Sequence, residues 1–110
     1  MPYDDELANR LRELVKGERG LSEKRMFGGL AFLIDGKLAV SACSGGGLLL
    51  RIDPTLTESL VSEPHVGRFE MRGRVMDGWL RVDADVLKTD DELRRWVGHG
   101  LTYARSLPPK

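Results

Sequence analysis

Two Asp-Gly pairs, Asp35-Gly36 and Asp77-Gly78, constrain the fold of this 110-residue chain more than any other feature. Between alternating apolar segments, Asp-Gly favours a two-residue turn and is a strong short-range signal for a β-hairpin. We therefore expect one hairpin in KRMFGGLAFLIDGKLAV, residues 24–40, and a second in RFEMRGRVMDGWLRVD, residues 68–83. Each turn also predicts a register, because it sets which side chains of its two strands face each other.

The first hairpin is expected to pair one long strand, residues 24–34, with a strand that starts at Lys37. In this register Ala31 lies opposite Val40, and alternation divides the side chains between two faces. The face expected to point into the core carries Phe27, Ala31, Leu33, Leu38, Val40 and Ala42.

The opposite face of this hairpin is apolar on one strand only, through Met26, Leu30, Phe32 and Ile34. Side chains of this kind need cover, and two sources of cover are open. One is a helix around Leu56 and Leu60. The other is a second copy of the chain in a symmetric dimer.

Gly28 and Gly29 interrupt the long first strand, where glycine weakens a sheet and packs no side chain. The structural interpretation is a bend, or a close approach of another element, that requires a missing Cβ. The functional interpretation is a bare backbone that a ligand or peptide approaches. We expect the structural role, and we assign Gly36 and Gly78 structural roles in the two turns.

The outward face of the second hairpin is the candidate interaction surface. A turn at Asp77-Gly78 places Val75 opposite Leu80, pointing inward, and Arg74 opposite Arg81, pointing outward. Arginine and tryptophan are enriched at protein interfaces and can also stack on nucleic-acid bases. The surface comprises Arg72, Arg74, Met76, Trp79 and Arg81.

The alternative interpretation of this face is ordinary surface chemistry. Glu70, Asp77 and Asp83 would neutralise the arginines, and the last helix would cover Trp79.

Helical patterns lie at both ends of the chain. An amphipathic segment spans residues 4–17, a short helix is expected from Pro54, and a capping box at residues 89–92 opens a last helix that ends at Leu107. With a further strand at residues 48–53, the order is α-β-β-β-α-β-β-α. This order predicts a single α+β domain over residues 1–110, with the terminal helices packed on a curved, mostly antiparallel, five-stranded sheet.

Composition narrows the functional class. The chain has 17 basic and 17 acidic residues, so its formal net charge is zero, unlike a chain built mainly to wrap nucleic acid. The single Cys43 suits a reducing compartment. With no signal-like start and no apolar run of the ~20 residues that a membrane span needs, we expect a soluble cytoplasmic protein without membrane association.

No catalytic, metal-binding or cofactor site is predicted. Cys43, His65 and His99 show no local spacing of metal ligands or of a nucleophile with its base. SGGG at residues 44–47 lacks the Gly-Lys-Ser/Thr ending of a phosphate-binding loop and precedes a strand, so a plain hairpin loop is expected.

Several motifs in order resemble a known family. They are MFGG at 26–29, FLIDGKLAV at 32–40, LLLRID at 48–53, FEMRGRVMDGWLRV at 69–82 and YARSLPPK at 103–110. Together they resemble the N-terminal domain of the TfoX (Sxy) family, in its short stand-alone members, over about residues 20–110. The resemblance implies a bacterial role in competence and transcription regulation, alongside a cyclic-AMP receptor protein at promoters, and it implies no catalytic residues.

Three functions follow as hypotheses. The first is a non-enzymatic regulatory domain that binds a protein partner, and a balanced net charge favours it. The second is a nucleic-acid-associated module that uses the arginine-bearing strands. The third is an enzyme with a small unrecognised pocket.

Overall fold

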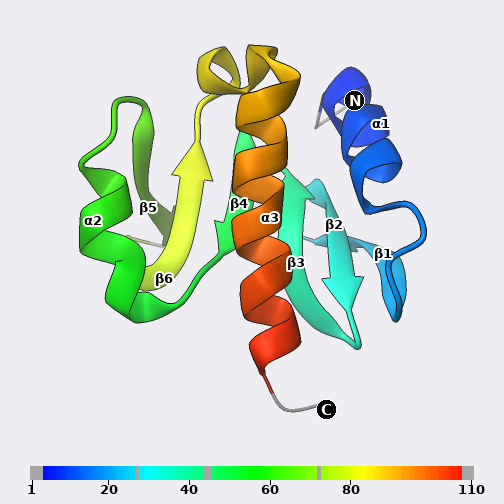
Figure 1. Ribbon diagram of the computed structural model, residues 1–110. Helices are drawn as coiled ribbons and strands as arrows, with labels where there is room; N and C mark the ends of the chain where they lie inside the picture. The colour runs from blue at the N-terminus through cyan, green and yellow to red at the C-terminus, as the bar shows by residue number, and fades with distance from the viewer. Residues whose placement is uncertain (1–3, 27, 44–45, 72, 108–110) are drawn as a thin grey trace.

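The computed structural model describes residues 4–26, 28–43, 46–71 and 73–107 and shows an α+β fold (Figure 1). Within these residues all strands join one antiparallel sheet of six strands, in the order β1-β2-β3-β4-β6-β5. The α+β class is confirmed, whereas the expected number of five strands is wrong. The elements are α1 (Asp5–Val15), β1 (Leu21–Met26), β2 (Gly29–Ile34), β3 (Lys37–Ala42), β4 (Leu48–Arg51), the 3-10 helix η1 (Pro54–Leu56), α2 (Thr57–Val61), β5 (Val66–Met71), β6 (Arg74–Val82), the 3-10 helix η2 (Ala84–Lys88) and α3 (Asp90–Ser106).

The extra strand arises because the expected long first strand is itself a hairpin. Met26 of β1 pairs with Gly29 of β2, so the chain reverses between them, and Gly28 has a φ of 76°. A Cβ atom on Gly29 would lie 2.1 Å from the carbonyl oxygen of Ala42 on β3. Gly28-Gly29 therefore has the structural role that was expected, but as a chain reversal and a close strand contact. Phe27 lies outside the described residues.

The turn at Asp35-Gly36 forms as predicted, with Ile34 opposite Lys37. The register then shifts between Phe32 and Leu33, so that Ala31 pairs with Ser41 and not with Val40. Because of this irregularity, Leu38 and Val40 lie on different sides of the sheet, and the expected core face is divided. Val40 and Ala42 lie in the main core as expected, whereas Ala31, Leu33 and Leu38 do not. The side chains in the main core are Leu30, Phe32, Val40 and Ala42, whereas Ala31, Leu33 and Leu38 form a second cluster with Cys43 and Leu49.

The second Asp-Gly pair does not form the expected turn. The chain reverses between Met71 and Arg74, and Asp77-Gly78 lies inside β6. There β6 departs from β5, since Arg68 pairs with Leu80 but the next residue pairs with Met76. Because β6 also pairs with β4 on its other side, the Asp-Gly pair marks an irregularity in a continuous strand.

Neighbouring elements hold this irregularity in place. The Gly78 N–H donates to Thr57 Oγ1 at 2.8 Å, and the Ile52 N–H donates to the Gly78 carbonyl at 2.8 Å. Gly78 has a φ of 84°, and a Cβ atom there would lie 3.1 Å from Pro54 Cγ. The structural role predicted for Gly78 is thus right, although its place in the strand is different.

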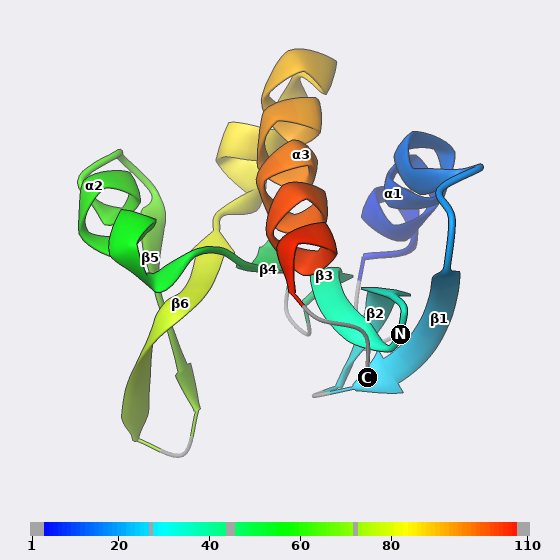
Figure 2. The same cartoon turned by 60° about the horizontal axis from the view of Figure 1, so that its bottom comes forward.

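The helices lie on one side of the sheet, with the β1–β2 and β5–β6 hairpins at its two ends (Figure 2). α1 and α3 contact the central strands, and α2 packs on β5 and β6. The main core forms between helices and sheet from residues that include Leu11, Val15, Phe32, Val40, Leu50, Leu80, Val82, Leu93 and Trp96. Leu80 and Val82 point inward, as the second hairpin predicted.

Most of the face expected to need cover is buried within the chain. Leu30, Phe32 and Ile34 are at most 6% exposed. Leu30 and Phe32 lie in the main core with residues of α1 and α3, and Ile34 lies in a cluster with Ala104 of α3. The prediction that a helix covers these side chains is therefore right. The helices are α1 and α3, and not the predicted helix around Leu56 and Leu60. Met26 packs in the second cluster, on the other face. These buried side chains are not available as a dimer contact.

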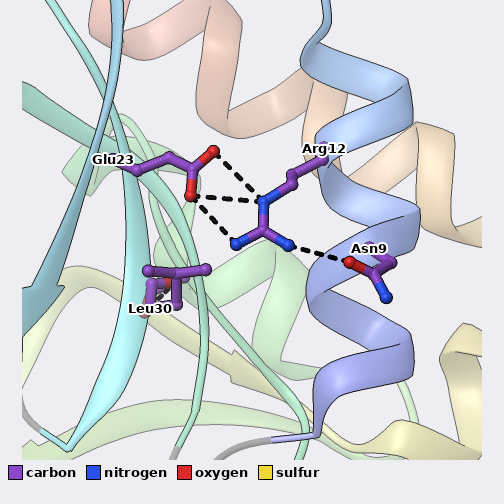
Figure 3. A network of polar contacts seen from close by, with 5 residues as sticks. Asn9, Arg12, Glu23 and Leu30 are labelled. Atoms are coloured by element: carbon purple, nitrogen blue, oxygen red, sulfur yellow. Dashed lines mark hydrogen bonds and ion pairs between the residues drawn. The ribbon is translucent and has the colours of Figure 1, made fainter.

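Polar contacts fix the ends of the helices. The Thr89 hydroxyl accepts from the Glu92 N–H at 3.3 Å, as the capping box predicted. The Arg12 guanidinium links α1 to β1, with its Nε 3.2 Å from both carboxylate oxygens of Glu23 and its Nη1 2.8 Å from Asn9 Oδ1 (Figure 3).

No helix in the described part of the chain has the length and apolar character to cross a membrane.

Candidate functional site

The structure separates Arg74 from Arg81, the two arginines of the candidate interaction surface that were expected to face each other, and keeps Trp79 and Arg81 two residues apart on β6. Arg74 pairs with Met71 at an exposed hairpin end, whereas Arg81 pairs with Leu49 and Gly67. The two arginines therefore do not face each other, because the turn lies elsewhere. Met76 pairs through its backbone with Phe69, and Arg72 lies outside the described residues.

Two arginines of these strands already have acidic partners. Arg81 donates to Asp83 Oδ1 at 3.1 Å and to the Gly46 carbonyl at 2.8 Å. Arg68 donates to Asp77 Oδ1 at 2.8 Å. The alternative interpretation, that carboxylates neutralise this face, is confirmed for Arg81 and Asp83.

Trp79 lies in a different group from the predicted one. Arg51, its cross-strand neighbour on β4, has its Cζ 5.3 Å from the centroid of the Trp79 ring and 5.6 Å from that of Tyr103 on α3. All three side chains are half-buried. We call these three residues the Arg51 stack. Among the described residues, no carboxylate lies within ion-pair distance of Arg51.

A groove adjoins the Arg51 stack on the helical side of the sheet. It lies between α3 and the segment that leads from β4 into η1, and its volume is about 470 Å³, within the range of ligand-recognition sites. Tyr103 belongs to both the groove and the stack, and Leu56 at the groove is 44% exposed. We call it the α3 groove, and it is lined by Ile52, Asp53, Leu56, Arg95, Gly98, His99, Thr102, Tyr103 and Ser106.

The charge at one end of the α3 groove is balanced. Arg95 binds both carboxylate oxygens of Glu63, at 2.8 and 2.5 Å. These hydrogen bonds lower the pKa of Glu63 and raise the pKa of Arg95. At the opposite wall, hydrogen bonds from the Thr55 N–H and hydroxyl lower the pKa of Asp53, so this carboxylate is ionised near neutral pH.

His99 is half-buried in the groove. Burial lowers the pKa of His99, and the positive charge of Arg95 lowers it further. The imidazole is therefore neutral near pH 7, with one nitrogen able to donate and the other able to accept a hydrogen bond.

A smaller pocket of about 180 Å³ lies on the opposite face of the sheet and includes Cys43, Phe69 and Arg81. Burial raises the pKa of the Cys43 thiol, and the nearby Arg81 guanidinium opposes this shift in part. His65 Nδ1 lies 3.3 Å from Asp83 Oδ2, away from the α3 groove that holds His99. In the part of the chain that the structure describes, no cluster of three potential metal-ligating side chains forms.

Sequence reasoning missed most of the α3 groove. Ile52 belongs to the strand expected over residues 48–53, and Leu56 belongs to the short helix expected from Pro54, but nothing in the pattern joins them to the last helix. The available signal was Gly98, an interior helical glycine that lies away from the buried stripe and lines the groove.

A comparison with protein-family models matches residues 13–104 to the family described as TfoX N-terminal domain. The matched range begins within α1 and contains every strand. It also contains the whole lining of the α3 groove except Ser106. A search of curated proteins gives no match.

Proposed function

The chain belongs to the TfoX N-terminal domain family, and on that premise we propose that it is a non-enzymatic regulatory domain that acts by binding a protein partner. The proposal includes a role in transcription regulation, of the kind linked to competence in proteins that this chain resembles. The partner binds at the α3 groove and the adjoining Arg51 stack.

One observation carries the proposal: the Arg51 stack adjoins a groove that has an exposed apolar side chain at its edge. Tryptophan, tyrosine and arginine are the residue types most enriched among binding hot spots, and here Trp79, Arg51 and Tyr103 lie together. Leu56, at 44% exposure, adds apolar area that a partner can bury.

The two alternative functions have less support. Arg68 and Arg81 have their charges balanced by Asp77 and Asp83, and the net charge of the chain is zero, so these two arginines are less available to bind phosphates. For an enzyme, the most nucleophilic side chain type present is Cys43, whose pKa is raised and which is therefore poorly ionised near pH 7.

Site-specific photo-cross-linking in the native host tests this proposal. Leu56 and Val75 are large apolar side chains with high exposure, at 44% and 59%, and they lie on different elements. A photoreactive phenylalanine analogue at position 56 is expected to capture a discrete protein, and the same analogue at position 75 is the matched control. Capture of the same protein with equal yield from both positions, or no capture from position 56, would contradict the proposal.

A further inference from the structure

β5 forms one edge of the sheet. It is the last strand in the sheet order, and within the described residues it pairs with β6 on one side only. Figure 2 shows the β5–β6 hairpin extending away from α2 and α3 at one end of the sheet. The unpaired backbone N–H and C=O groups of such an edge are able to bind a strand of another chain.

The charged side chains of β5 complement a second copy of the same strand. Arg68 and Glu70 flank Phe69, and they share one face of β5 because side chains alternate along a strand. Both are exposed, whereas Phe69 is half-buried with the second cluster on the other face. When two copies of β5 lie antiparallel with the two Phe69 residues opposite each other, Arg68 of each copy faces Glu70 of the other.

The charges also select this register over its neighbours. Centring the pair one residue earlier places Arg68 opposite its own copy, and centring it one residue later does the same for Glu70. Like charges directly opposite each other destabilise a sheet, and opposite charges stabilise it. The register centred on Phe69 is therefore the favoured one.

β1, the strand at the other edge of the sheet, is less suited to pair with its own copy. A register centred on Glu23 or Lys24, the two middle residues of β1, places like charges opposite each other. The Glu23 carboxylate also binds Arg12 of α1 at 3.2 Å. A second copy of the chain therefore fits the β5 edge better than the β1 edge.

Both charged groups of β5 are able to make a further contact. Arg68 donates to Asp77 Oδ1 at 2.8 Å through its Nε, and a guanidinium has further N–H donors on its two Nη atoms. Glu70 forms no ion pair with any residue that the structure describes. Arg68 can therefore keep Asp77 and bind a second carboxylate.

We propose that the chain forms a symmetric homodimer in which the β5 strands of two copies pair antiparallel about a two-fold axis at Phe69. The two six-stranded sheets become one continuous sheet, and the Arg68–Glu70 contact forms twice. This interface lies apart from the α3 groove, so the inference goes beyond the proposed function and does not depend on it.

Light scattering coupled to size-exclusion chromatography tests the dimer over a range of protein concentrations. One pair of six-residue strands is a small interface, so the mass is expected to rise from that of a monomer to that of a dimer as the concentration increases. A monomeric mass at every concentration would overturn the inference.

Charge exchange locates the contact. Arg68→Glu and Glu70→Arg each place like charges opposite each other and are expected to weaken dimerisation by about tenfold or more. The double variant Arg68→Glu with Glu70→Arg exchanges the two charges and is expected to restore the dimer. Lys24→Glu on the other edge strand is the matched control, with no change expected. A dimer that both single substitutions leave unchanged would overturn the inference.

Hydrogen exchange of the unsubstituted chain keeps the test decisive if a variant does not fold. The β5 amides that point away from β6 are expected to exchange more slowly as the protein concentration increases, while exchange in β1 stays the same. Exchange in β5 that does not depend on concentration, or concentration-dependent protection of β1 alone, would overturn the inference.

Discussion

Gly98 and Gly100 lie two residues apart on α3, but only Gly100 is required by the packing of the helix. A Cβ atom on Gly100 would lie 2.4 Å from the Ala39 carbonyl oxygen, because α3 crosses β3 closely at this point. A Cβ atom on Gly98 would point into the α3 groove and meet nothing within 4 Å. The two glycines therefore serve different purposes in one helix.

Alanine substitutions at these two positions are expected to change stability in opposite directions. Gly98→Ala adds helix propensity without a clash and should stabilise the fold by about 0.5–1 kcal/mol. Gly100→Ala forces α3 away from the backbone of β3 and should destabilise the fold by about 1–3 kcal/mol. Urea denaturation of the three proteins measures both changes. Destabilisation by Gly98→Ala would show that this position is constrained by packing.

The hydroxyl of Thr57 is expected to be essential to the path of β6. Thr57 is 1% exposed, and its Oγ1 accepts the Gly78 N–H at 2.8 Å. Thr57→Val keeps the shape but leaves a buried N–H without a partner, which should cost about 1–3 kcal/mol of unfolding free energy. Thr57→Ser retains the hydroxyl and is the control. If serine and valine reduce the denaturation midpoint equally, the hydrogen bond is not the cause.

Mild acid is expected to destabilise the fold through His99. The pKa of His99 is lowered in the folded state by burial and by Arg95, so the unfolded state binds more protons once the pH falls below its ordinary pKa of about 6.5. Stability should therefore decrease as the pH falls from about 7.5 to about 5.5. The pKa of Glu63 is also lowered in the folded state, but protonation of this carboxylate decreases the stability of the fold only at more acidic pH.

His99→Gln is the variant that isolates this effect. The drop in unfolding free energy between the two pH values should be smaller for His99→Gln than for the unsubstituted chain. An identical drop in both proteins would mean that His99 does not link protonation to folding.

Double-stranded DNA is expected not to retain this protein, even in low-salt buffer. Arg68 and Arg81 are paired with Asp77 and Asp83, and the chain has as many acidic as basic residues. Binding through phosphates would appear as retention that collapses steeply as salt increases. Such a profile, abolished by Arg74→Glu with Arg81→Glu, would support the nucleic-acid alternative.

The two Asp-Gly pairs show that a local sequence signal predicts backbone conformation better than it predicts a reversal of the chain. Asp35-Gly36 makes the predicted turn with Ile34 opposite Lys37, and both residues have positive φ angles, 51° and 80°. Gly78 has a similar φ of 84°, so its local conformation also agrees with the signal. Whether the chain reverses there depends on contacts distant in sequence, since Thr57 and the backbone of Ile52 hold Gly78 inside a continuous strand.

The alternation of side chains was predictable wherever the register was simple. Leu80 and Val82 point into the core as expected, because alternation along β6 continues from Trp79 onward. Val75, expected to pair inward with Leu80, is instead 59% exposed, since the irregularity at Asp77-Gly78 separates the two residues.

The candidate site could not be predicted because its parts come from distant segments. Arg51, Trp79 and Tyr103 lie on β4, β6 and α3, and no pattern within any one segment joins them. Trp79 was identified from its residue type alone, with the wrong neighbours. Gly98 was the one local irregularity that pointed to the α3 groove.

If the partner binds in the α3 groove, a side chain that fills the groove should weaken binding. Gly98→Met places a flexible side chain where a Cβ atom meets no neighbour within 4 Å. Affinity for the protein captured from position 56 should fall by about tenfold or more, while the urea midpoint stays equal or rises. A stable Gly98→Met protein that binds this partner with unchanged affinity would show that the partner does not bind in the α3 groove.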